Sequence, residues 1–172
     1  PHPTGTRQMK SPNGNVKVYK LNDDNHWKPN TWQDSQIPVS NSSSTWDDNT
    51  DVNRDLIQAM YVGNTVFDAM NANSIPFASL KAGVLTSQSN SYSLEQSTPL
   101  EAIIQLGNHG GSPFGTYDIF AHEMGHSYIR RFFNSSATNE GDRLHEGIAD
   151  CLGEYIENKI LGSNNWIICG ED

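Results

Sequence analysis

The stretch Asp118-Ile119-Phe120-Ala121-His122-Glu123-Met124-Gly125-His126 carries the clearest structural signal in this sequence. Its apolar residues recur at helical spacing, so we predict a helix over residues 118–133. Because one helical turn takes about 3.6 residues, His122 and His126 project from the same face and can bind one ion. Glu123 lies beside the coordination position that remains open. The pattern therefore predicts a metal centre on this helix.

A second polar segment, Glu146-Gly147-Ile148-Ala149-Asp150, lies on the next predicted helix, over residues 143–161. Antiparallel packing of the two helices would bring Glu146 opposite His122 and His126. Two nitrogens and one oxygen, with water as the fourth ligand, form the donor set of a catalytic zinc site. Asp150 shares the face of Glu146 and is placed to accept the free ring N–H of a ligand histidine. We therefore predict one catalytic Zn²⁺, bound by His122, His126 and Glu146.

Other ligand patterns are tested by spacing. A third histidine six residues after the second, with a glycine between, marks the metzincins, but Phe132 and Ile129 occupy those places. His145 is the competing ligand nearby. On a helix its side chain points about 100° away from that of Glu146, so both cannot easily bind the same ion. We favour Glu146 and interpret His145 as a neighbour of the ligands or as a surface residue.

We predict a single domain over the whole sequence, residues 1–172. Residues 1–53 are rich in turn-forming residues and short apolar pairs, which indicates strands and turns. Apolar residues at helical spacing predict a helix over residues 54–70, and residues 75–117 return to strands and loops. The clearest strands there lie near Ala82 to Thr86 and Ala102 to Leu106.

Composition excludes several classes of partner. The 172 residues carry a formal net charge of -9, with 11 basic residues against 20 acidic ones. No cationic patch for nucleic acid or anionic lipid is evident, and no apolar run is long enough to span a membrane. The chain starts at Pro1 without a leader, which fits either a processed mature chain or a recombinant fragment, so secretion is permitted and not shown by this feature. Cys151 and Cys169 are close enough along the chain for a disulfide, and two separate thiols are the alternative.

At this point the sequence resembles the thermolysin-like metallopeptidases, a gluzincin family. The resemblance covers residues 55 to 172 and rests on five segments: residues 118–126, residues 146–153, Trp166 with Gly170-Glu171-Asp172, residues 59–68, and Asn90-Ser91-Tyr92-Ser93. It implies an α+β, zincin-like fold, in which a twisted, mostly antiparallel sheet packs on an active-site helix and a second zinc-ligand helix.

The resemblance also implies an activity: an endopeptidase that hydrolyses extended peptides through a zinc-activated water. Glu123 would be general base and proton shuttle, and Asp150 would orient His122. Asn90 and Ser91 would pair with the backbone of the substrate. A calcium ion in the family implies a Ca²⁺ site drawn from Asp118, Glu157 and Glu171. The same resemblance suggests secretion.

Two departures from the family pattern define an alternative. Ala137 stands where the family has a tyrosine that stabilises the tetrahedral intermediate. The family also continues into a carboxy-terminal helical half, and this sequence stops at Asp172, so we expect that half to be absent here or to act as a separate partner. Loss of one such donor costs about 3 kcal/mol of transition-state stabilisation. The alternative function is therefore a zinc-binding module that is inactive or incomplete as a catalyst.

Overall fold

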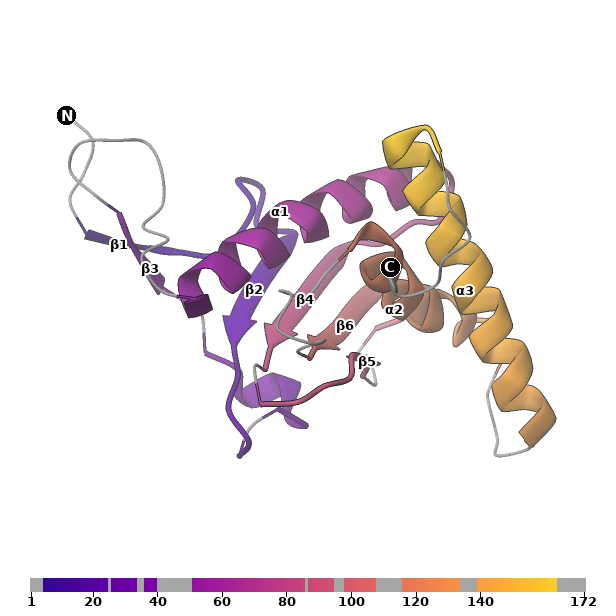
Figure 1. The fold of residues 1–172 in the computed structure, drawn as a ribbon, viewed down its shortest axis with the longest axis horizontal. Helices are drawn as coiled ribbons and strands as arrows, with labels where there is room; N and C mark the ends of the chain where they lie inside the picture. Colours follow the sequence, from indigo (N-terminus) through magenta and orange to yellow (C-terminus); the bar gives the residue numbers. More distant parts are fainter. Residues whose placement is uncertain are drawn as a thin grey trace.

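A four-stranded sheet and three long helices make up most of the chain that the structure describes (Figure 1). The computed structural model describes residues 5–24, 26–33, 36–39, 51–85, 87–94, 98–107, 116–133 and 139–163. The helices are α1 (Asp51–Ala72), α2 (Tyr117–Ile129) and α3 (Asn139–Leu161), with a short 3-10 helix, η1 (Pro29–Thr31). The sheet has the spatial order β2 (Val16–Lys20), β4 (Ser79–Val84), β6 (Glu101–Leu106) and β5 (Tyr92–Ser93). A separate antiparallel pair, β1 (Gly5–Gln8) and β3 (Gln36–Val39), lies at the left of Figure 1, at the end of the molecule away from α3.

The α+β class predicted from the sequence is confirmed, but the predicted strand orientation is wrong. Within the four-stranded sheet, β2 pairs with β4 and β4 pairs with β6 in parallel, and the β5–β6 pair is antiparallel. The physical reason is the connection between β2 and β4, which contains α1. A helical crossover of that length carries the chain back to the end of the sheet at which β2 began, so the next strand can run parallel to it. A tight hairpin would impose antiparallel neighbours.

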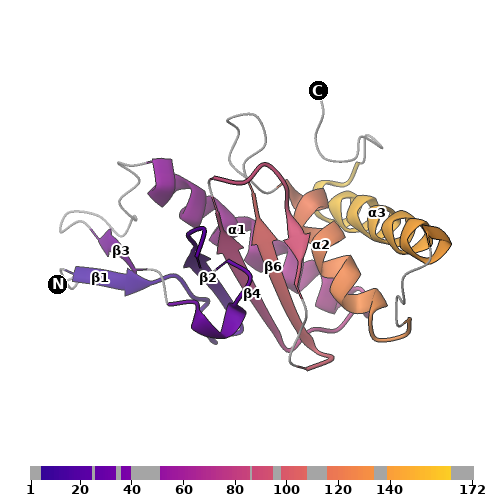
Figure 2. The same cartoon turned by 90° about the horizontal axis from the view of Figure 1, so that it is seen from below.

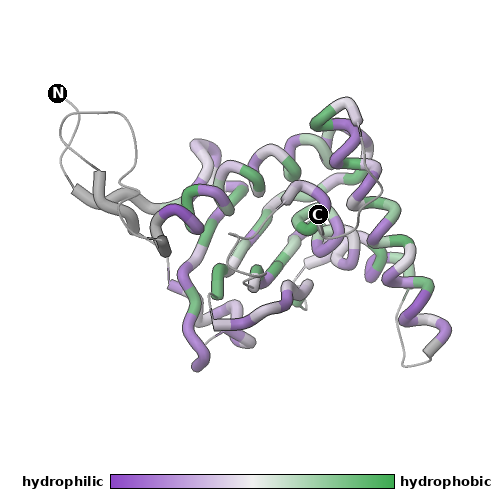
Figure 3. Tube along the Cα trace, in the orientation of Figure 1, coloured by the Kyte–Doolittle hydropathy of each residue, from purple (hydrophilic) through white to green (hydrophobic). Residues whose placement is uncertain are grey.

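Both faces of the sheet are covered by apolar side chains. Figure 2 shows the strands in front of α1, and Figure 3 shows hydrophobic positions along β2, β4 and β6. The larger core lies between this sheet and the helices, and includes the fully buried Leu80, Ile104 and Phe120. The opposite face holds a smaller cluster around Trp32 and Ile103. Every residue of β6 is buried, so the central part of the sheet gives α2 a rigid support.

The two helices expected to carry the ligands pack against each other at two glycines. A side chain at Gly125 of α2 would come within 3.4 Å of the Ala149 Cα on α3. A side chain at Gly153 of α3 would come within 3.0 Å of the Asp118 carbonyl on α2. These positions let the two backbones approach closely. The predicted helix over residues 118–133 is observed over residues 117–129, and the chain then turns through i to i+3 hydrogen bonds such as Phe132 N to Ile129 O, 2.9 Å.

None of the helices in the described part of the chain combines the length and the apolar character that a membrane span requires.

Candidate metal centre

Three donor atoms from two helices converge at one point of the structure. His122 Nε2 and His126 Nε2, both from α2, lie 2.9 Å apart. Glu146 Oε2, from α3, lies 3.4 Å from each of them. Among the residues that the structure describes, these three form the group of histidine, cysteine and acidic residues whose donor atoms are close enough to share a metal ion. The fold thus brings together the three residues that the sequence predicts as ligands.

The donor set fits a tetrahedral zinc ion. With ligand bonds of about 2.0–2.2 Å, neighbouring donors of a tetrahedral ion lie about 3.3 Å apart, and the two distances to Glu146 match this value. The two imidazole nitrogens are closer together, and a neutral His126 directs an unprotonated lone pair at its neighbour when its other ring nitrogen carries the proton. When both Nε2 atoms lack a proton, their lone pairs repel each other, and a cation between the three donor atoms would relieve that repulsion.

Asp150 of α3 lies beside the imidazole ring of His122. Asp150 Oδ1 lies 2.9 Å from His122 Nδ1, a short contact whose direction falls outside hydrogen-bond geometry. A carboxylate beside Nδ1 favours the tautomer with the proton on that nitrogen, which leaves Nε2 as the metal donor. The structure therefore places Asp150 where the sequence predicts an orienting residue.

His145 contacts His126, the other predicted histidine ligand, and does not belong to the converging donor group. Its Nδ1 lies 2.7 Å from His126 Nδ1, and the two rings are nearly parallel, at 6°. Burial lowers the pKa of His145, and burial also lowers the pKa of His126 to about 3, with a further contribution from His122, His145 and Arg130. His126 is therefore neutral at physiological pH, which is the form that binds a metal ion.

Glu123 follows His122 on α2, lines the same cleft as the three donor residues, and is 6% exposed. Burial raises the pKa of its carboxyl to about 8, and the nearby Glu146 charge adds to this rise. The positive charge of Arg130 and a hydrogen bond from the backbone of Ser93 oppose it. A carboxyl group whose pKa lies near neutrality can both accept and release a proton under physiological conditions, which is what general acid–base catalysis requires.

A cleft of about 510 Å³ opens over these residues, between β5 and the helix pair. Asn90 and Ser91 line its strand side, as the sequence predicts for residues that contact a substrate. Gly107, at the end of β6, allows this approach, because any side chain there would collide with the Asn90 carbonyl. Ser91 Oγ accepts a hydrogen bond from the Gly107 backbone, 3.3 Å.

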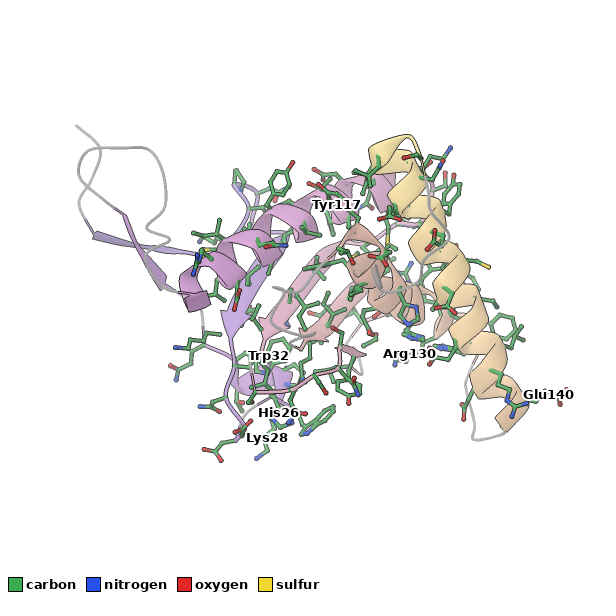
Figure 4. All side chains as sticks on the ribbon, viewed as in Figure 1. His26, Lys28, Trp32, Tyr117, Arg130 and Glu140 are labelled. Atoms are coloured by element: carbon green, nitrogen blue, oxygen red, sulfur yellow. The ribbon has the colours of Figure 1, made fainter. Side chains whose placement is uncertain are left out.

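Sequence reasoning did not single out Arg130, which also lines the cleft. Figure 4 shows Arg130 at the end of α2, on the side of β5. The signal was available, because Arg130 follows His126 by one helical turn and so shares the face of the metal ligands.

The remaining predicted residues are not all described. Asp118 is 4% exposed on α2, and burial, together with the charge of Asp118, raises the pKa of Glu157 on α3. They do not belong to a converging donor group among the described residues, and Glu171 lies outside those residues. Calcium binding remains a prediction without support. Ala137, Trp166 and Cys169 also lie outside the described residues, and the possible partner of Cys169, Cys151, is exposed.

Comparison with known proteins supports the fold. No protein-family model matches the chain, and no curated protein matches its sequence. Among solved structures, the chain is similar to the precursor of protealysin, a metalloproteinase from Serratia proteamaculans, with a TM-score of 0.57 and 13% sequence identity. The match covers 86% of this chain and 44% of that chain.

The structure thus combines a known fold with a candidate metal site. The chain has an α+β fold that is found in a metalloproteinase, and it carries two histidines and a glutamate that converge as a candidate metal site. The similarity to the protealysin precursor shows the fold, and the donor geometry shows a candidate metal site.

Proposed function

We propose that this chain is the zinc-bearing part of a metalloendopeptidase that cleaves extended peptides. The observation that carries the proposal is the convergence of His122, His126 and Glu146 in the lining of a cleft that the buried Glu123 also lines. A site that served structure alone would be expected to close with a fourth protein ligand, and it would not need a carboxylate beside an open position.

The residues divide the reaction between them. His122, His126 and Glu146 would hold the zinc ion, and the bound ion would supply Lewis-acid polarisation of the scissile carbonyl and of the attacking water. Glu123 would accept the proton that the water loses and later transfer it to the leaving amine. Asp150 would keep His122 in the tautomer and ring orientation that binding requires.

The substrate proposal rests on β5, which lies at the edge of the sheet in the described part of the chain. An extended peptide can add to such an edge through backbone hydrogen bonds, while its side chains point alternately into and out of the cleft. Asn90 and Ser91 lie where this pairing would occur. We therefore propose a protein or peptide substrate. From the resemblance of the sequence to the thermolysin-like family, we also propose that the enzyme is secreted.

A second candidate function is a zinc-binding module that is catalytically incomplete. The observation that favours it is that the chain spans 44% of the length of the metalloproteinase precursor that it matches. In this case, the missing elements of the cleft would have to come from a further part of the same enzyme.

Both functions are tested with the full 172-residue chain loaded with one equivalent of zinc. We expect cleavage of a reduced, unfolded protein, and we expect 1,10-phenanthroline to abolish it. The control is Glu123→Gln, which keeps the shape of the side chain and the three ligands and removes the base. Cleavage by the parent and not by the variant supports the peptidase. One bound zinc without cleavage supports the incomplete module, and no bound zinc contradicts both.

A further inference from the structure

Arg130 binds the edge strand of the cleft through three hydrogen bonds. Its Nη1 donates to Ser93 Oγ at 2.9 Å and to the Leu94 carbonyl at 3.1 Å. Its Nη2 donates to the Ser93 carbonyl at 3.0 Å. The planar guanidinium group thus holds two successive backbone carbonyls in a fixed geometry that the single ammonium group of a lysine could not reproduce.

Ser93 makes two further contacts with side chains of α2. Its Oγ lies 2.9 Å from Ser127 Oγ, which is one residue after the ligand His126. Its backbone N–H donates to the carboxylate of Glu123, the proposed general base. The side chain, carbonyl and amide of one strand residue are therefore all bound by side chains of the metal-ligand helix.

The strand needs such an anchor, because β5 is only two residues long. It pairs with β6 at Tyr92 and Ser93, and Leu94 N donates to the Ile103 carbonyl at 2.8 Å. Its other edge faces the cleft. A strand this short, with few backbone hydrogen bonds, belongs to the part of a structure that opens most easily.

We propose that Arg130 is a positioning residue that pins β5 to α2 through Ser93 and so keeps the peptide-binding edge and the Glu123 carboxylate in register with each other. This inference rests on the proposed peptidase function for its kinetic consequence, and on the hydrogen bonds alone for its structural one. The same hydrogen bonds limit which backbone groups of the strand can pair with a peptide substrate. Because the carbonyls of Ser93 and Leu94 accept hydrogen bonds from Arg130, the backbone that a peptide can use lies on the side of Asn90 and Ser91.

The structural test uses the full chain without substrate and compares Arg130→Gln with Arg130→Lys and Arg131→Gln. Arg131 is a matched control, because it removes the same charge from the neighbouring position, where the guanidinium binds the Pro76 carbonyl and stacks on Phe77. In Arg130→Gln, we expect amide hydrogen exchange at Ser93 and Leu94 to rise about tenfold. We expect a smaller rise in Arg130→Lys and none in Arg131→Gln.

The kinetic test uses the same variants with one equivalent of zinc. A displaced base and edge strand should lower kcat/KM about a hundredfold in Arg130→Gln, with the larger share in kcat. Arg130→Lys should recover part of this loss, and Arg131→Gln should match the parent. All of the variants should bind one zinc, since Arg130 contacts none of the proposed ligands in the hydrogen bonds above.

The outcomes separate the two proposals. Unchanged exchange at Ser93 and Leu94 in Arg130→Gln would overturn the positioning role, whatever the activity. A rise that extends equally to the amides of β6 would also overturn it, because it would indicate general destabilisation. If the parent binds zinc and cleaves nothing, the peptidase proposal fails, and the exchange data still decide whether Arg130 pins β5.

Discussion

The two helices that carry the proposed ligands differ in how firmly the rest of the chain holds them. Most residues of α2 are buried between the sheet and α3, and the side chain of His126 is 9% exposed. The side chain of Glu146, on α3, is 60% exposed. In α3, fewer residues are buried, and they include Ala149 and Ile156 in the core. His126 is therefore held by the core, whereas the position of Glu146 depends on how α3 packs on α2.

This difference suggests a division of tasks. The α2 residues provide a preformed pair of donors, whose rotamers are restricted by packing. Glu146 has more freedom and completes the site when the two helices are in contact and an ion is present. Substitution of a proposed ligand on α2 should therefore abolish metal binding. Substitutions on α3 should weaken metal binding without abolishing it.

The largest effect is expected from His126→Ala, compared with Glu146→Gln. Removing the buried histidine deletes one of the two preformed donors, so we expect no stoichiometric zinc binding by competition against a chromophoric chelator. Glu146→Gln keeps both histidines and should retain weakened binding. Equal and complete loss in both variants would show that the two helices contribute alike.

The next effect concerns the residue that orients His122. Asp150→Asn should weaken zinc binding by about 10- to 100-fold, as is typical when the partner of a ligand histidine is changed. Asp142→Asn is the matched control, because it removes the same charge from the same helix, at a residue that lines the cleft. A similar loss in both variants would indicate that general charge, and not orientation, is responsible.

Helix contact is tested by two glycine substitutions on α3. Gly153→Ala places a methyl group 3.0 Å from the Asp118 carbonyl, so we expect the free energy of unfolding to fall by about 1–3 kcal/mol in urea titrations. The same change at Gly147 meets nothing within 4 Å and should stabilise the helix by about 0.4–1 kcal/mol. A neutral result at Gly153 would mean that α3 can shift on α2 at little cost.

The smallest effect is expected at Glu157, at the far end of the helix pair. Burial, with the like charges of Asp118 and Glu154, raises the pKa of this carboxyl. Since the folded state favours the protonated form, the ionised form costs stability as the pH rises through this pKa. Glu157→Gln should therefore stabilise the chain at pH 7 by about 0.3 kcal/mol, after screening by solvent, and not at all at pH 3. A calcium-dependent loss of stability in this variant would instead support the predicted calcium site.

Local features of this fold could be predicted from sequence, because helical periodicity depends on neighbours in the chain. The predicted helix over residues 54–70 is observed as α1 (Asp51–Ala72), and the one over residues 143–161 as α3 (Asn139–Leu161). The strand expected at residues 82–86 is observed at Ser79–Val84, with Thr86 outside the described residues. Boundaries shift by a few residues, since capping and fraying depend on tertiary contacts.

Strand orientation and the surroundings of the ligands could not be predicted in the same way. Parallel pairing in the sheet depends on where the α1 crossover returns the chain, and periodicity within a strand carries no such information. The three proposed ligands are found by spacing, but the contact of His145 with His126 requires knowledge of how α3 is rotated on α2. The hydrogen bonds from Arg130 to Ser93 join segments far apart in sequence, which a motif cannot reveal.

The parallel pairing of β2 with β4 has a consequence for the order of folding. It joins Val16 to Leu80 across a loop that contains all of α1, so the entropy of closing a long loop must be overcome before this pairing forms. The α2–α3 hairpin joins segments that are close in sequence and has no such delay. We therefore expect zinc present during refolding to find its proposed ligands on a nascent helical hairpin, before β2 has joined the sheet.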